Sequence, residues 1–233
     1  MADPQLPRSS RRRSSSTAKT PVLVVGLGRF GGAVATELEA LGFEVLGADT
    51  DAKRVHAYAD ELTHVVIADT SEAEVLRQLG AADFKLAVVG IGSDIEASIL
   101  TTAALVDVGV PNIWAKAVTK AHGRILSRVG AHHVVYPEHE MGRRVAHLVG
   151  ARIVDWFQLD ADFAMVETAA PASLVGRPLS QLDLPRRHGV TVVCIKPAGG
   201  AFSFVGPGTV LNEGDLVVVA GPADRAEAFA NLA

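Results

Sequence analysis

The sequence has little cysteine and no long apolar run, and each absence excludes a class of protein. Among its 233 residues the one cysteine is Cys194, which excludes a disulfide within the chain and a four-cysteine zinc site. No run of about 18 apolar residues is present, so the sequence predicts no membrane-spanning helix. The charged, serine-rich N-terminus is not followed by an apolar segment, so no secretory signal is expected. Together these features predict a cytoplasmic protein.

Charge is low in total but unevenly distributed. The chain carries 22 Lys and Arg against 26 Asp and Glu, a net charge of −4. Residues 1–20 alone carry +4, so the remainder of the chain carries −8. Nucleic-acid binding requires a basic footprint, and an acidic body therefore predicts no nucleic-acid partner. We expect residues 1–20, with their Arg and Ser runs, to be a solvated, disordered tail.

From Pro21 onward, short apolar runs alternate with segments of helical spacing. The apolar runs are continuous, as in strands that are covered on both faces. This pattern predicts an α/β fold, a Rossmann-like doubly wound parallel sheet over residues 21–137. The predicted strands are 22–25, 44–48, 64–68, 86–91, 113–116 and 133–136. The first predicted helix is 30–41, and Asp51 can cap a second that runs to about 59. A third follows Thr70 and Ser71 and closes at Gly80, a fourth follows 92–93 and ends near 109, and a fifth runs from 119 to 130.

The pattern changes after Gly150. A predicted helix over 138–149 forms a linker, 138–152, to a smaller α+β domain over 153–233. There the predicted strands lie closer together, at 153–159, 164–168, 190–195, 201–205 and 216–220, before a last helix over 222–232. A domain of about 80 residues buries only a small core, so we expect it to dock on a second copy of itself.

Residues 26–31 read Gly-Leu-Gly-Arg-Phe-Gly and match the G-x-G-x-x-G phosphate-binding pattern. The segment follows a predicted strand and opens a predicted helix, and Asp49 ends the next strand. In this context Gly26 allows a tight turn, Gly28 lets the backbone approach phosphates, and Gly31 lets helix and strand pack closely. Asp49 is expected to accept hydrogen bonds from ribose hydroxyls and to disfavour a 2′-phosphate. A glycine-rich turn without a ligand is the alternative.

Other polar residues lie at the carboxyl ends of the predicted strands, where such sheets bind ligands. Arg29 can reach a terminal phosphate, or it can face solvent. Asp69 can border an adenine pocket or cap a helix, and Lys116 ends the fifth strand. Glu138 can ligate a divalent cation or begin the next helix. Thr50, Thr70, Ile91 and Gly92 adjoin these strand ends and complete the candidate set.

No catalytic constellation is evident, so the sequence predicts a binding protein and not an enzyme. The glycine motif and Asp49 alone would also suit an NAD-dependent oxidoreductase, which remains an alternative. Four histidines cluster in sequence without an H-E-x-x-H pattern, and we expect surface or interface roles for them rather than a metal site. They are His132, His133, His139 and His147.

Four segments together resemble a known family. Residues 24–32, 90–92, 111–116 and 137–142 are similar to the RCK (KTN or TrkA) family, the cytoplasmic regulatory subunits of Ktr-type potassium transporters. The resemblance covers residues 21–233. It implies an N-terminal domain that binds ATP or ADP, or NAD(H) in some members. It further implies homodimers that assemble an octameric ring on the inner face of a membrane potassium channel subunit, where nucleotide exchange gates potassium flux.

The resemblance also implies site residues. Arg29 would contact the γ-phosphate, and Glu138 would help to bind Ca²⁺ or Mg²⁺ between subunits. The positions that match the nucleotide site are Gly26, Gly28, Arg29, Phe30, Gly31, Asp49, Asp69 and Lys116.

The C-terminal domain resembles those that bind cyclic di-AMP at a dimer interface. Pro185 stands where relatives often place a phosphate-binding arginine, and the neighbouring Arg186 and Arg187 are candidate replacements. The alternatives are a dimerising domain with an empty groove and a free-standing cyclic di-AMP sensor that regulates another cation transporter. The implied lining residues are Leu179, Leu184, Val190, Thr191 and Pro207.

Overall fold

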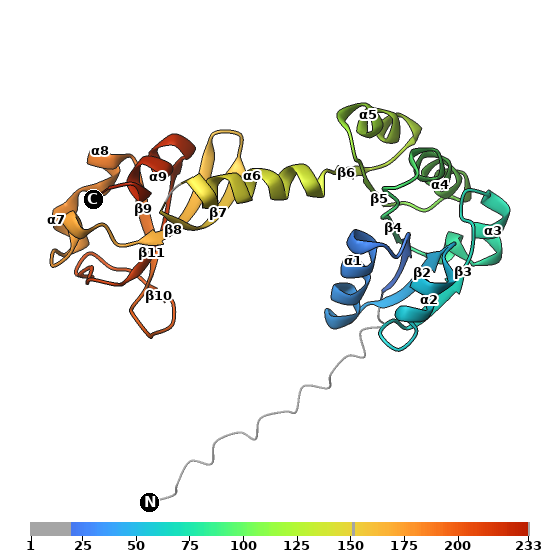
Figure 1. The fold of residues 1–233 in the computed structure, drawn as a ribbon, viewed down its shortest axis with the longest axis horizontal. Coiled ribbons are helices and arrows are strands. Elements are labelled where there is room, and N and C mark those ends of the chain that lie inside the picture. The colour runs from blue at the N-terminus through green and yellow to red at the C-terminus, as the bar shows by residue number, and fades with distance from the viewer. Residues whose placement is uncertain (1–19, 151, 233) are drawn as a thin grey trace, which may run out of the picture. The chain divides into compact units, whose positions relative to one another are not determined.

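The computed structural model describes residues 20–150 and 152–232 (Figure 1). The chain divides into two compact units, Met1–Pro137 and Glu138–Ala233. The tail predicted over residues 1–20 lies, apart from Thr20, outside the described residues. Among the residues described, no helix has the length and apolar character needed to cross a bilayer.

The first unit is built on a six-stranded sheet, and all of its neighbouring strands pair in parallel. The strand order is β3-β2-β1-β4-β5-β6, so the chain runs outward from β1 on one side and then restarts on the other side at β4. This confirms the predicted doubly wound sheet and puts its switch point between β1 and β4. The strands are β1 (Pro21–Val25), β2 (Glu44–Asp49), β3 (His64–Ile67), β4 (Leu86–Val89), β5 (Ile113–Lys116) and β6 (His133–Val135).

Helices cover both faces of this sheet, which explains why β1 is an unbroken apolar run. Val22 and Val24 pack into one core with residues of α1 and α2, whereas Leu23 and Val25 pack into a second core with residues of α3, α4 and α5. Successive side chains of a strand point to opposite faces, so both sets are buried. The helices are α1 (Arg29–Ala40), α2 (Ala52–Ala57), α3 (Ala73–Gln78), α4 (Ile95–Val108) and α5 (Lys120–Val129).

Helix ends follow capping chemistry that the sequence shows. α4 and α5 both end at a glycine in the left-handed region, Gly109 and Gly130. The side chains of Asp51, Asp94 and Thr119 each accept a hydrogen bond from a first-turn amide. The helix that Asp51 was expected to cap is α2, which ends at Ala57 rather than near Ala59. The helix expected after Ser71 and before Gly80 is α3.

The second unit contains an antiparallel sheet in the order β10-β9-β11-β8-β7, with short helices beside it. This confirms the predicted smaller α+β domain. The strand expected over 201–205 shrinks to the two-residue β10, and two short helices, α7 and α8, were not predicted. The elements are β7 (Ile153–Asp160), β8 (Phe163–Ala169), α7 (Leu179–Leu182), α8 (Leu184–His188), β9 (Thr191–Lys196), β10 (Ser203–Phe204), β11 (Leu216–Pro222) and α9 (Ala223–Ala230).

The last turns of helix α6 (Pro137–Gly150) are anchored within the second unit. Arg144 forms a bidentate pair with Asp155 of β7, with Nε–Oδ1 at 2.9 Å and Nη2–Oδ2 at 2.6 Å. The ring of His147 stacks on Trp156, 3.8 Å between centroids and 6° from parallel. Because Trp156 belongs to the domain core, these contacts join the helix to the sheet.

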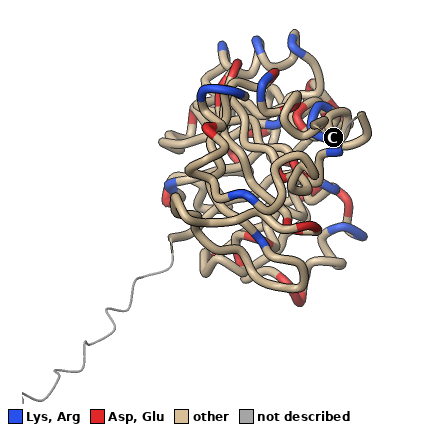
Figure 2. Tube along the Cα trace, turned by 90° about the vertical axis from the view of Figure 1, so that its left-hand side faces the viewer, with Lys and Arg blue, Asp and Glu red and all other residues tan. Residues whose placement is uncertain are grey.

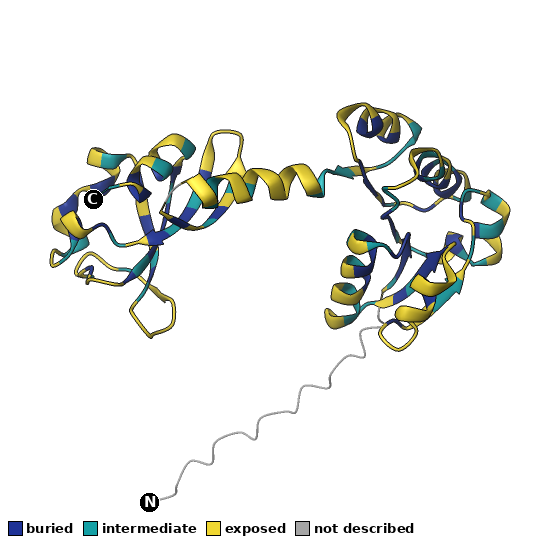
Figure 3. Cartoon of the chain, viewed as in Figure 1, coloured by how far each residue is buried: buried dark blue, intermediate teal, exposed yellow. Residues whose placement is uncertain are grey.

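Burial and charge agree with this organisation. Buried residues concentrate in the strands of both sheets, whereas α6 contains no fully buried residue (Figure 3). Basic and acidic residues are interspersed along the described trace (Figure 2).

Candidate nucleotide-binding site

The glycine-rich turn between β1 and α1 lies at the switch point of the parallel sheet. Gly26 has a φ of +86°, which side-chain-bearing residues rarely adopt. A Cβ on Gly31 would overlap the carbonyl oxygen of Gly26, and one on Gly90, in the loop after β4, would lie 2.9 Å from the same oxygen. Gly26, Gly31 and Gly90 therefore pack so closely that the inner side of the turn has no room for a side chain. A Cβ on Gly28, by contrast, would have no atom within 4 Å, so this side of the turn is open.

The start of α1 is available to an anion. Gly28 is its N-cap residue and supplies no side-chain hydrogen bond, and no acidic residue lies in the first turn. The equivalent ends of α4 and α5 are each capped by a side chain, from Asp94 and Thr119. Backbone amides and the helix dipole thus present uncompensated positive charge next to the open glycine, which is the arrangement that receives phosphates.

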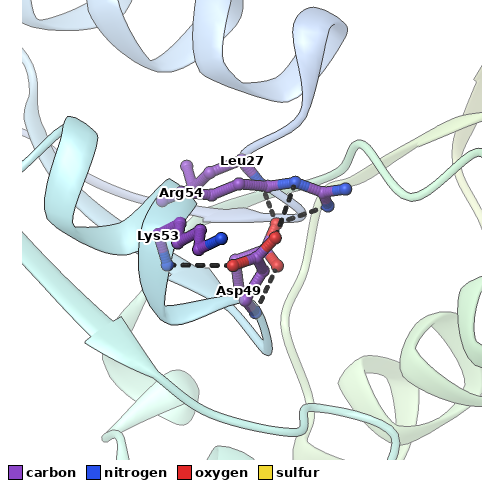
Figure 4. Close-up of polar contacts among 5 residues, drawn as sticks. Leu27, Asp49, Lys53 and Arg54 are labelled. Carbon is purple, nitrogen blue, oxygen red and sulfur yellow. Dashed lines mark hydrogen bonds and ion pairs between the residues drawn. The ribbon is translucent and has the colours of Figure 1, made fainter.

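Asp49 ends β2 and is 5% exposed. Its Oδ2 accepts hydrogen bonds from the Leu27 amide at 2.7 Å and from Arg54 Nη1 at 3.3 Å (Figure 4). Its Oδ1 accepts one from the Asp51 amide at 2.8 Å. The carboxylate therefore fixes the glycine-rich turn to the end of β2. The Leu27 amide and Arg54 were missed in the sequence, where a basic residue early in a helix has no distinguishing signal.

Lys116 at the end of β5 reaches the same edge. It is 9% exposed, and its Nζ lies 5.8 Å from the centroid of the Phe30 ring. A Cβ on Gly92 would lie 3.0 Å from the same nitrogen. The structure thus brings Phe30, Gly92 and Lys116 together. Arg29, the first residue of α1, is exposed.

Asp69 and Thr70 follow β3 and differ in exposure. Asp69 is exposed and accepts hydrogen bonds from the Ser71 hydroxyl at 2.7 Å and the Ser71 amide at 3.1 Å, and these bonds lower its pKa. It does not cap α3, whose N-cap residue is Glu72, so the helix-capping alternative is wrong. Thr70 is buried, with its Oγ1 3.1 Å from that of Thr101 on α4.

The remaining N-domain candidates border the turn. Ile91 contacts the turn directly, since a Cβ on Gly26 would lie 2.9 Å from its Cγ1. Thr50 is exposed beside Asp49. Both therefore lie at the same sheet edge as the glycines.

The implied C-domain residues divide into two groups. Leu184 and Val190, 3% and 1% exposed, belong to the hydrophobic core of the domain. Leu179 lies beside the segment that contains Pro207, because the Leu179 amide donates to the Thr209 carbonyl at 2.8 Å and the Ser180 amide to the Pro207 carbonyl at 3.0 Å. Arg187 and Thr191 are exposed.

Two of the clustered histidines have structural contacts in the first unit. His132 Nδ1 accepts the Ile113 amide at 3.1 Å, and the ring of His133 stacks on Trp114 at 4.1 Å. Glu138 is exposed in the first turn of α6. Within the described ranges, no group of three or more His, Cys, Asp or Glu side chains could hold a metal ion.

A doubly wound domain with a glycine-rich turn at its switch point, followed by an antiparallel-sheet domain, defines a two-domain protein with a candidate nucleotide-binding site. The TrkA-N domain model matches residues 22–137, and the TrkA-C domain model matches residues 163–233. The chain belongs to the TrkA-type (RCK/KTN) family, which includes the Ktr system potassium uptake proteins.

Several relatives align along nearly their whole length. Ktr system potassium uptake protein C of Bacillus subtilis (strain 168) is 38% identical, over 87% of this chain and 92% of the relative. Ktr system potassium uptake protein A of the same organism is 35% identical, over 89% of this chain and 94% of the relative. The protein A of Vibrio alginolyticus is 35% identical, over 87% and 92%.

Solved structures show the same fold at lower identity. The structure titled "GsuK channel bound to NAD" has a TM-score of 0.62 and 17% identity, over 92% of this chain and 39% of that one. The TrkA-N domain of the inner membrane protein ybaL from Escherichia coli has a TM-score of 0.50 and 20% identity, over 56% and 96%. The present chain thus spans about two-fifths of the length of the GsuK channel chain.

Proposed function

We propose that this chain is a cytoplasmic regulatory subunit of a potassium uptake system and that it binds an adenine nucleotide as a signal. The observation that carries the proposal is the alignment, with both domains in the same order, over 92–94% of three Ktr potassium uptake proteins. The open Gly28 and the uncapped start of α1 support a phosphate-bearing ligand.

In this proposal the ligand is ATP or ADP, or alternatively NAD(H). Its phosphates lie on the amides that begin α1, and its ribose hydroxyls bind Asp49. Arg29 binds a terminal phosphate and Lys116 adds positive charge. The positions that border the ligand are Thr50, Asp69, Thr70, Ile91 and Gly92, with Phe30 beside Lys116.

The nucleotide acts as a switch and not as a reactant. ATP and ADP share the adenine and ribose contacts and differ by one phosphate, which Arg29 distinguishes. A ligand shifts a conformational equilibrium only by its difference in affinity for the two states, and such couplings are typically about 1–3 kcal/mol per site. Homodimers assembled into an octameric ring on a membrane channel subunit would add these differences and keep the chain peripheral to the inner face of the membrane.

The residues of one chain do not by themselves fit the divalent cation that the family implies. Glu138 supplies one carboxylate, whereas Ca²⁺ takes six to eight oxygen ligands and Mg²⁺ six. A Ca²⁺ or Mg²⁺ site at Glu138 would therefore need oxygens from nucleotide phosphates or from a second chain.

Cyclic di-AMP in the C-terminal domain remains a separate prediction. The exposed candidates are Arg187, Thr191 and Pro207, next to the partly buried Leu179. Because Leu184 and Val190 are buried in the core, they would support the residues of such a site and would not contact the ligand themselves.

The test uses the purified full chain with ATP, ADP, NADH and cyclic di-AMP, by thermal melting and calorimetry. A ligand that binds only the native state raises the melting temperature. We expect ATP and ADP to bind and to produce different potassium fluxes in vesicles that contain a Ktr membrane subunit and this chain. Turnover of NADH with a carbonyl substrate, without discrimination between ATP and ADP, would contradict the proposal. Tight cyclic di-AMP binding without any effect on flux would favour the free-standing sensor.

A further inference from the structure

The contacts of Asp49 leave little room for a ribose. Three donors of the described residues reach this carboxylate: the Leu27 amide, the Asp51 amide and the Arg54 guanidinium. An ionised carboxylate offers about four acceptor positions, two on each oxygen. Both positions on Oδ2 are used, by Leu27 and Arg54, whereas Oδ1 has one position left (Figure 4).

A ribose with free 2′ and 3′ hydroxyls brings two donors to a carboxylate that has one acceptor position left. One of the three resident donors must therefore leave before both hydroxyls can bind. A 2′-deoxyribose brings a single donor, which the remaining position on Oδ1 can accept without any displacement. Binding of a ribose to Asp49 therefore requires a resident donor to leave, whereas binding of a 2′-deoxyribose does not.

Arg54 is the resident donor best able to leave. The Leu27 and Asp51 amides belong to the backbone and lie at 2.7 and 2.8 Å from the carboxylate. The guanidinium lies at 3.3 Å, and its side chain is 48% exposed. It also has a second partner, because its Nε lies 3.7 Å from Oδ2 of Asp51. Arg54 can therefore release Asp49 and remain paired.

We propose that Arg54 is a specificity-determining residue of the nucleotide site, which competes with the ribose for Asp49 and so reduces the preference for ribonucleotides over 2′-deoxyribonucleotides. This inference rests on the proposed function, because it takes Asp49 as the ribose acceptor. It assigns Arg54 a positioning role: the residue acts through Asp49 and not through the phosphates.

The experiment measures the dissociation constants of ATP and 2′-deoxy-ATP for the full chain by calorimetry and compares their ratio between variants. Arg54→Ala removes the competing donor, and Arg54→Met removes it while keeping the aliphatic stem. We expect both substitutions to raise the preference for ATP about threefold, the value of a partly exposed ion pair. A general loss of structure would weaken the binding of both nucleotides and leave the ratio of their dissociation constants unchanged.

The matched control is Lys53→Ala, which removes a neighbouring positive charge from a residue that bonds Asp51 through its backbone amide only. For Lys53→Ala we expect the ratio of the dissociation constants of 2′-deoxy-ATP and ATP to equal that of the unmodified chain. An unchanged or lowered ratio in Arg54 variants that still bind ATP as tightly as the Lys53→Ala control would overturn this inference alone. Failure of the unmodified chain to bind either nucleotide would overturn the proposed nucleotide site as well.

Discussion

Gly31 on α1 lies so close to Gly26 that a methyl group on Gly31 would overlap the Gly26 carbonyl oxygen. The contact is between backbones, so it cannot relax through a side-chain rotation. It holds the first helix against the turn that precedes it and fixes the direction of the first-turn amides.

We therefore expect Gly31→Ala to destabilise the chain, although alanine is the better helix former. The added methyl group would force the helix away from the strand, and overpacking of this kind costs about 1–3 kcal/mol. The free energy of unfolding, measured by denaturant titration, reports this directly. A midpoint equal to that of the unmodified chain would show that the turn is softer than the structure indicates.

Gly28→Ala is the matched control for Gly31→Ala, because it should weaken nucleotide binding while leaving the stability of the chain nearly unchanged. At Gly28 φ is −73° and ψ is −168°, an extended conformation open to any residue, and a Cβ there has no neighbour within 4 Å. Stability should change by less than about 0.5 kcal/mol, because the lower entropy of the unfolded alanine chain is offset by the poorer N-cap that alanine makes for α1. Nucleotide affinity should fall by about tenfold or more, because the methyl group occupies the space through which phosphates approach. Unchanged affinity by calorimetry would contradict the assigned site.

Arg29→Ala tests discrimination between nucleotides. The side chain is exposed at the first position of α1, so its removal should change the unfolding free energy by less than about 0.5 kcal/mol. We expect ADP binding to remain nearly intact and ATP binding to weaken about tenfold, the value of a hydrogen bond to a charged group. An equal loss for both nucleotides would show that Arg29 does not recognise the terminal phosphate.

His122 should make the first domain sensitive to acid. The imidazole is 2% exposed, its Nδ1 accepts the Val118 amide at 3.4 Å, and its Nε2 is buried without a hydrogen-bond partner. Burial lowers its pKa below the ordinary value of 6.5. The unfolded chain then binds more protons, so this contribution is fully present above pH 6.5 and is lost as the pH falls below it.

The measurement is the unfolding free energy of the chain and of His122→Asn between about pH 7.5 and 5.5. Asparagine retains an oxygen that can accept the Val118 amide and does not titrate. We expect a shallower decline for the variant. Parallel profiles would assign the acid sensitivity to other groups.

The sequence predicted the elements that depend on local chemistry. The apolar run of β1 indicates burial on both faces, and the left-handed glycines Gly109 and Gly130 mark helix ends. The glycine pattern and the position of Asp49 at the end of β2 follow from the strand–turn–helix order. These features were predictable because each depends on residues close together in the chain.

Other features depend on contacts between distant segments or on unusual backbone. The pairing of Arg54 with Asp49 requires α2 to direct the Arg54 side chain toward the end of β2, and the apolar periodicity of the sequence does not indicate this direction. Leu184 and Val190, two of the implied lining residues, pack into the core of the second domain, and their burial depends on strands that are distant in the sequence. Asp183, a non-glycine residue with a φ of +46°, separates α7 from α8 and sets the direction of this segment. Its left-handed conformation has no reliable sequence signature.

Each unit of the chain contains one of its two tryptophans, and each indole stacks on a histidine. Trp114, on the first sheet, is 37% exposed, whereas Trp156, against the last turns of α6, is 4% exposed. Their fluorescence should therefore differ in wavelength and in accessibility to a soluble quencher. Replacing either one by phenylalanine leaves an intrinsic optical reporter for the other unit, so ligand responses of the two domains can be followed separately without an added dye.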